Sequence, residues 1–248
     1  MKRSKKNKLT EKPPALAREI VERLRALGDP KRANASLRYF KTGPGEYGEG
    51  DLFVGIPVPV LRRLSGEHGS LSLEETTSLL QSPIHEARLL ALFMLVSAYG
   101  SADEAQKERI FRLCLDNTRF INNWDLVDSS ADRIVGAHLR DQGKEGLYAL
   151  AESPLVWERR IAIMATFCYI KEGEFSETLR IAGMLLHDRE DLIHKAVGWM
   201  LREVGNRDQA AEESFLRSRY RDMPRTMLRY AVERFPEGLR QRYLRGDI

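Results

Sequence analysis

The chain has 248 residues, of which 42% are hydrophobic and 31% are charged, with 40 lysines and arginines against 36 aspartates and glutamates. This composition excludes a disordered or fibrous chain, because it supplies enough apolar side chains to bury a sizeable core. The formal charge of +4 is unevenly placed. Six cations and one acid fall in residues 1–12, and the rest of the chain is nearly neutral.

The N-terminal segment is rich in lysine but has no apolar stretch after its cations, so it does not read as a secretory signal. We expect a disordered basic arm over residues 1–13 and a single helical domain over residues 14–248. The longest nearly continuous apolar run, residues 89–99, is too short to cross a bilayer. Cys114 and Cys168 lack the spacing of a disulfide or metal pair. These features predict a soluble cytoplasmic protein that does not contact a membrane.

From the end of the arm onward, apolar residues recur at intervals of three and four, which predicts an all-α fold. Glycines and prolines divide this pattern into helices, and the helices come in pairs. The second helix of each pair opens on a polar turn followed by an apolar run, starting at His85, Trp124, Trp157, Ile193 and Met223. Spacings of 30 to 39 residues between these starts predict an α-solenoid of about five or six HEAT-like antiparallel pairs, with the second helices lining a concave face.

Between the first helices lies the Gly-rich stretch GPGEYGEGD, within residues 39–64. It superficially suggests a phosphate-binding loop. Its Glu46, Glu49 and Asp51 would repel phosphate, so the composition favours a specialised loop of another kind.

The five histidines never fall at the short spacings that are typical of metal ligands. We therefore expect them at the surface or capping helices, and we predict no metal. The sequence also has no nucleotide-binding glycine motif, and we predict no cofactor.

Aligning the second helices places Arg88, Asp128, Arg160 and Lys195 at equivalent positions in the first turns. Cations repeated along a concave face would follow a phosphate backbone, whereas a carboxylate there opposes binding. A carboxylate near a helix start commonly caps backbone amides. However, Trp124 lies four residues before Asp128 and therefore on the same face, and an aromatic ring beside a carboxylate suits a cationic ligand. The residues alone leave both readings open.

The segments YFKTGPGEYGEGDLFVGIPVPVLRRL, NNWDLVDSSA, WERRIA and KAVGWMLRE together resemble the AlkD-type DNA alkylation repair glycosylases, over about residues 35–235. The resemblance implies a HEAT-like repeat enzyme that hydrolyses the N-glycosidic bond of cationic N3- and N7-alkylated purines in duplex DNA without flipping the base. It places the catalytic aspartate at Asp128, a DNA-backbone contact at Arg160, and aromatic contacts at Trp124, Trp199 and Tyr39. Short members have two consecutive tryptophans where this chain has Asn123 and Trp124, and their loop is shorter.

The chemistry that the resemblance implies needs only one carboxylate. An alkylated purine is already cationic and leaves without protonation, so a single aspartate can stabilise the oxocarbenium-like sugar and orient water. Glycosidases with poor leaving groups carry two carboxylates. We therefore predict a monofunctional, monomeric glycosylase for 3-methyladenine and 7-methylguanine, with double-stranded DNA as its partner and no obligate protein partner. The alternatives are a non-catalytic binder of damaged or branched DNA and a protein-interaction scaffold.

Overall fold

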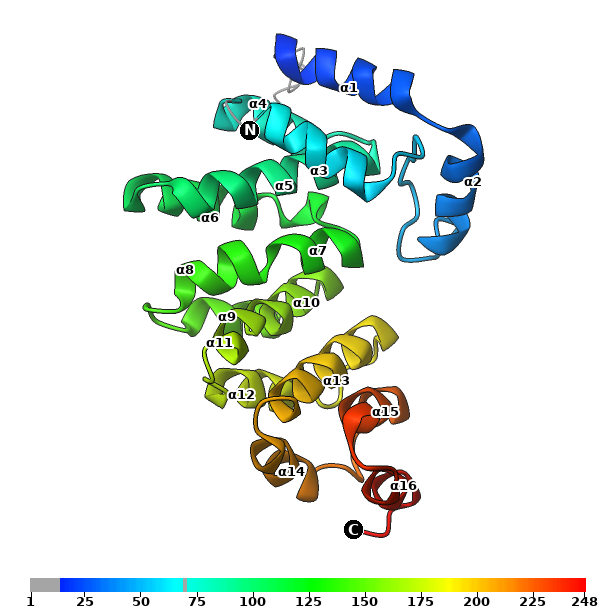
Figure 1. Cartoon of the computed structure of the whole chain (residues 1–248), viewed down its shortest axis with the longest axis vertical. Helices are drawn as coiled ribbons and strands as arrows, with labels where there is room; N and C mark the ends of the chain where they lie inside the picture. The colour runs from blue at the N-terminus through cyan, green and yellow to red at the C-terminus, as the bar shows by residue number, and fades with distance from the viewer. Residues whose placement is uncertain (1–13, 69–70) are drawn as a thin grey trace, which may run out of the picture.

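The computed structural model describes residues 14–68 and 71–248, so the predicted basic arm lies outside the described residues. The described part is helical and contains no strand, apart from one isolated bridge between Leu52 and Ile84. Figure 1 shows the helices stacked in chain order along the long axis of the molecule. The predicted all-α class is confirmed.

The first half of the stack contains α1 (Ala15–Leu27), α2 (Pro30–Tyr39), α3 (Val58–Glu67), α4 (Leu73–Leu80), α5 (His85–Ser101), α6 (Glu104–Asp116) and α7 (Trp124–Ser130). A 3₁₀ turn, Thr118–Phe120, precedes α7, and a π-helical turn, Asp132–Gly136, joins it to α8 (Ala137–Leu139). The second half contains α9 (Glu145–Ala151), α10 (Val156–Ala165), α11 (Phe167–Lys171), α12 (Ser176–Met184), α13 (Asp191–Gly205), α14 (Gln209–Arg217), α15 (Arg225–Ala231), the 3₁₀ turn Val232–Arg234 and α16 (Glu237–Arg245).

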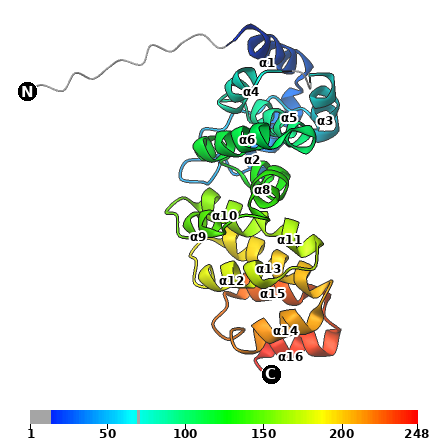
Figure 2. The ribbon, with the colours of Figure 1, turned by 90° about the vertical axis from the view of Figure 1, so that its left-hand side faces the viewer.

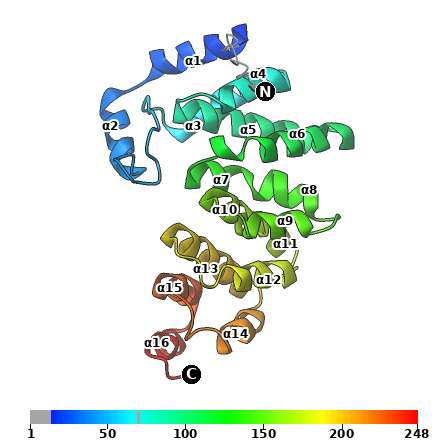
Figure 3. The ribbon, with the colours of Figure 1, turned by 180° about the vertical axis from the view of Figure 1, so that it is seen from behind.

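The second helices of the pairs form a continuous inner row. In this row α5 contacts α7, α7 contacts α10, α10 contacts α13 and α13 contacts α15. Their observed starts lie within two residues of the predicted ones. The first turns of α7, α10 and α13 lie on the side of the stack toward which α2 projects (Figure 1). Figure 3 shows that the end of α2 and the segment after it reach the level of α7. The predicted solenoid of helix pairs is confirmed.

The side of the stack away from α2 carries the outer helices, which descend in chain order toward the C-terminus (Figure 2). The inner helix α5 is enclosed because α3, α4 and α7 all contact it. Every residue from Leu89 to Leu95 is buried there, as is typical of a helix that is apolar on all sides. No helix within residues 14–68 and 71–248 is long and apolar enough to cross a membrane.

A π-helical turn follows α7 and lets the inner row pack closely. The amide of Gly136 donates to the carbonyl of Ala131 at 2.8 Å, five residues back along the chain. A Cβ at Gly136 would lie 2.1 Å from the carbonyl oxygen of Ala165 in α10. Only glycine allows the two backbones to approach this closely.

Glu212 on α14 is buried against α13, and its Oε1 has no hydrogen-bond partner. Burial raises the pKa of Glu212 from its ordinary 4.5 to about 9. Between pH 4.5 and about pH 9, folding therefore takes up a proton. The free energy of unfolding falls by about 1.4 kcal/mol for each unit by which the pH rises through this range. We expect Glu212→Gln to be more stable than the wild type at about pH 8 and less sensitive to pH, as measured by urea unfolding from about pH 5.5 upward. A wild-type stability that does not fall over this range would contradict the prediction.

Candidate functional site

The carboxylate of Asp128 on α7 forms a two-pronged ion pair with the guanidinium of Arg160 on α10. Nε of Arg160 donates to Oδ1 at 2.9 Å, and Nη2 donates to Oδ2 at 2.8 Å. Nη1 donates to the carbonyl oxygen of Leu192 on α13 at 2.6 Å. One arginine thus joins three consecutive inner helices, with the side chains of Arg160 and Asp128 only 5% and 15% exposed. A buried cation committed to a carboxylate is not free for a phosphate, which corrects the prediction that Arg160 contacts the DNA backbone.

Asp128 does not cap its helix. The cap of α7 is Asn123, whose Oδ1 accepts from the amide of Trp124 at 2.9 Å, and Asp128 lies one turn further along. Burial raises the pKa of Asp128, Arg160 opposes the rise, and the neighbouring charges of Asp125 and Asp132 add to it. The two-pronged geometry is that of an ionised carboxylate bound to arginine. The site therefore holds one oriented carboxylate in a poorly solvated setting, where its electrostatic effect is large.

An aromatic cluster adjoins this pair. The ring of Trp124 stacks on Phe40 at a centroid distance of 5.4 Å, and Tyr39 meets Trp124 edge-on at 5.8 Å. Phe40 stacks in turn on Phe53 at 4.9 Å. Tyr39 is 65% exposed, so it forms the open edge of the cluster. The structure brings two of the three predicted aromatic residues, Tyr39 and Trp124, into direct contact and adds Phe40, which sequence reasoning missed.

Arg88 lies in the interior, which corrects the prediction that it belongs to a row of exposed cations. Its Nη2 donates to Oδ1 of Asp51 at 2.6 Å, and its Nη1 donates to the carbonyl oxygen of Ser82 at 3.0 Å. Both Arg88 and Asp51 are buried. A cation committed to a buried carboxylate is not free for a phosphate, so we assign Arg88 no contact with DNA.

His85 is buried between two carboxylates. Its Nδ1 lies 3.1 Å from Oδ2 of Asp51, and its Nε2 lies 2.8 Å from Oδ2 of Asp125. Burial lowers the pKa of His85, but the hydrogen bonds to Asp125 and Asp51 outweigh burial and the pKa is raised. We therefore assign an imidazolium that donates to both carboxylates. His138 is also buried, so the predicted surface or capping role is wrong for both histidines.

The sequence model of a family described as DNA alkylation repair enzyme matches residues 20–235. The chain belongs to the DNA alkylation repair enzyme family. The fold is similar to that of a solved structure described as a predicted DNA alkylation repair enzyme from Enterococcus faecalis, with 16% identity, a TM-score of 0.64, and coverage of 85% of this chain and 97% of that chain. AlkD2 from Streptococcus mutans is similar at 16% identity with a TM-score of 0.49, covering 88% and 98%. No curated protein gives a match.

Two further predicted site residues lie on α13, Lys195 from the alignment of helix starts and Trp199 from the resemblance to the repair family. Lys195 pairs with Asp191 at 2.7 Å and its side chain is 43% exposed. Trp199 packs against Phe167 of α11, with ring centroids 6.4 Å apart, and its indole N–H donates to Glu203 at 3.3 Å. The structure thus leaves Lys195 accessible, whereas the contacts of Trp199 lie with α11 and its own helix rather than with Trp124.

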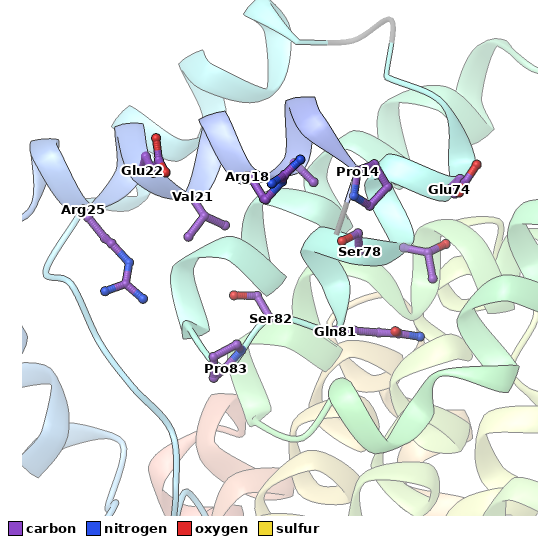
Figure 4. A pocket seen from close by; sticks show the side chains of 12 residues that line it. Pro14, Arg18, Val21, Glu22, Arg25, Glu74, Ser78, Gln81, Ser82 and Pro83 are labelled. Carbon is purple, nitrogen blue, oxygen red and sulfur yellow. The ribbon is translucent and has the colours of Figure 1, made fainter. Parts of the chain in front are cut away.

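A pocket of about 1090 Å³ lies apart from this site, between α1 and α4 (Figure 4). Its lining mixes Arg18 and Arg25 with Glu22 and Glu74, and it shares no residue with the Asp128 and Trp124 cluster. Among the residues that the structure describes, no group of three or more histidine, cysteine, aspartate or glutamate side chains is placed to hold a metal ion.

Proposed function

We propose that the protein is a DNA glycosylase that hydrolyses the N-glycosidic bond of cationic alkylated purines, such as 3-methyladenine and 7-methylguanine, in duplex DNA without flipping the base. The observation that carries the proposal is Asp128, a carboxylate that caps nothing and is oriented by Arg160 one turn from Trp124. Membership of the DNA alkylation repair enzyme family supports a role on alkylated DNA.

The proposed reaction uses the lone pairs that the ion pair leaves free on the carboxylate oxygens of Asp128. Each carboxylate oxygen accepts one hydrogen bond from Arg160, so each retains a lone pair for another partner. One oxygen faces the positive charge that develops at C1′, and the other orients the attacking water. Water adds to C1′, the electrons of the C–N bond neutralise the cationic purine as it leaves, and a proton passes to solvent. Arg160 acts on the DNA chemistry by holding Asp128 in place.

A base-release assay tests the proposal. We expect the wild type to liberate 3-methyladenine and 7-methylguanine from methylated duplex DNA, measured by chromatography of the free bases. Asp128→Asn is the matched control, because it preserves the shape of the side chain and removes its charge. No release above the blank, or equal release by Asp128→Asn, would contradict the proposal.

A second candidate is a non-catalytic binder of damaged or branched DNA. It is favoured by the small exposure of Asp128 and by its commitment to Arg160, since such a pair also serves to join α7 to α10. This candidate predicts binding to junction DNA that Asp128→Asn leaves unchanged, together with no base release.

Lys195 is expected to contribute to the salt dependence of DNA binding. If it meets one phosphate, Lys195→Gln reduces the slope of log affinity against log salt by about 0.9. Lys171 offers a matched control, because its side chain is 42% exposed and also pairs with an aspartate, Asp132. Its helix, α11, lies on the side of the stack away from α2 (Figure 1). Fluorescence anisotropy across a salt series measures both. Equal slopes for the two variants would rule out a specific phosphate contact by Lys195.

A further inference from the structure

The segment between α2 and α3, here called the glycine loop (residues 41–57), is anchored by buried side chains of α5. The carboxylate of Glu86 accepts the amides of Val54 at 3.1 Å and Gly55 at 2.7 Å. Asp51 is held by Arg88 and His85, and it also accepts from Nδ2 of Asn123 at 3.3 Å. Buried charges are costly unless they are paired, and these are paired with groups that set the position of the loop.

The tip of the glycine loop is equally well defined. The amide of Gly48 donates to the carbonyl oxygen of Lys41 at 3.0 Å, and a Cβ on Gly48 would lie 2.4 Å from the carbonyl oxygen of Phe40. Glu46 and Glu49 turn back on the loop, where they accept the amides of two glycines at 2.8 and 2.9 Å. The two carboxylates are therefore bound within the loop. Tyr47, which lies between them in the sequence, is the side chain that reaches the inner helices.

Tyr47 is half-buried and packs against the inner helix α10. Its ring meets Trp157 of α10 edge-on, at a centroid distance of 5.9 Å and an angle of 76°. Burial raises the pKa of its hydroxyl, although the indole of Trp124 and the positive charge of Lys195 oppose the rise. The contact with Trp157 places the ring beside α10, one turn before Arg160, the residue that forms the ion pair with Asp128.

We propose that Tyr47 is a positioning residue of the Asp128 site, which contacts the deoxyribose of the damaged nucleotide and holds it against the carboxylate. The proposal rests on the proposed glycosylase function. Nothing in the loop needs an aromatic side chain at this position for its own hydrogen bonds, which come from backbone amides and acidic side chains. An aromatic ring beside a carboxylate stabilises a cationic sugar, and a rigid loop keeps that ring in place.

Excision by Tyr47→Ala, Tyr47→Phe and Pro44→Ala tests this role. At saturating methylated duplex DNA we expect Tyr47→Ala to release base about 10- to 100-fold more slowly than the wild type, because misplacement affects the chemical step. Tyr47→Phe retains the ring and should restore most of the rate. Pro44→Ala changes an exposed residue of the same loop and should match the wild type. Thermal unfolding checks that all three variants are folded.

A binding measurement separates failure of this proposal from failure of the glycosylase function. The probes are duplexes that contain a cationic pyrrolidine abasic analogue or its neutral tetrahydrofuran counterpart. We expect the wild type to prefer the cationic probe, and Tyr47→Ala to lose about 10-fold of that preference. If the wild type releases no base, the proposed function fails. If the wild type and Tyr47→Ala then also show the same preference for the cationic probe, the role of Tyr47 is overturned as well. The role is also overturned if Tyr47→Ala releases base at the wild-type rate, or if Pro44→Ala slows base release as much as Tyr47→Ala does.

Discussion

Asp128→Asn is expected to release methylated purines about 100- to 1000-fold more slowly than the wild type. The amide keeps the size of the carboxylate but cannot balance the positive charge of the sugar in the transition state. Binding to undamaged duplex DNA should be unchanged or tighter, because a negative charge facing a polyanion is removed. Single-turnover excision and anisotropy measure the two effects separately. A comparable loss of binding and of rate would indicate a folding defect rather than a catalytic role.

The dependence of excision on pH provides an independent check on Asp128. Since burial raises its pKa, excision should fall as the pH is lowered through that raised value, where the carboxylate takes up a proton. Arg160→Gln removes the charge that opposes the rise. The acidic limb of the profile should therefore move to higher pH in Arg160→Gln. An unshifted limb would mean that another group controls the reaction.

Asp51→Ala is expected to destabilise the protein by about 3–5 kcal/mol. The substitution leaves Arg88 and the imidazolium of His85 buried without their shared carboxylate, and it frees the glycine loop from α5. The large effect comes from the stranded charges rather than from the lost hydrogen bonds alone. Urea unfolding at neutral pH measures the change, and excision should fall with it because Tyr47 loses its support.

Glu49→Ala is the matched control for this prediction. It removes an acidic side chain from the same loop, but Glu49 is exposed and its carboxylate accepts the amide of Gly45. We expect a loss below about 1 kcal/mol. If Asp51→Ala and Glu49→Ala destabilise equally, the buried network does not hold the loop as described.

The fold follows closely from local patterns. Apolar spacing and the recurring polar first turns place the inner helices within two residues of their observed starts, because helix periodicity is a property of a short stretch of chain. Even the burial of α5 is evident from its uninterrupted apolar run. The π-helical turn after α7 has no such signature, since it arises where Gly136 meets the backbone of α10.

The candidate site depends on partners that local patterns do not reveal. Asp128 and Arg160 are 32 residues apart in the chain, so an alignment of helix starts marks both residues but not their pairing. The same alignment gives Arg88 the role of an exposed cation, yet Asp51 in the glycine loop draws it into the interior. Asp51, which the composition of the loop suggests would repel phosphate, instead holds the loop to α5 through Arg88 and His85.

The amino-acid sequence by itself determined the helix pairs, their order and the place of Asp128 in the inner row, because these depend on periodicity and on residues close in the chain. Only the tertiary structure decided which cation meets which carboxylate, and that Tyr47 reaches Trp157 of α10. The physical reason is that charge pairing and burial depend on distances between helices, which arise only once the pairs stack.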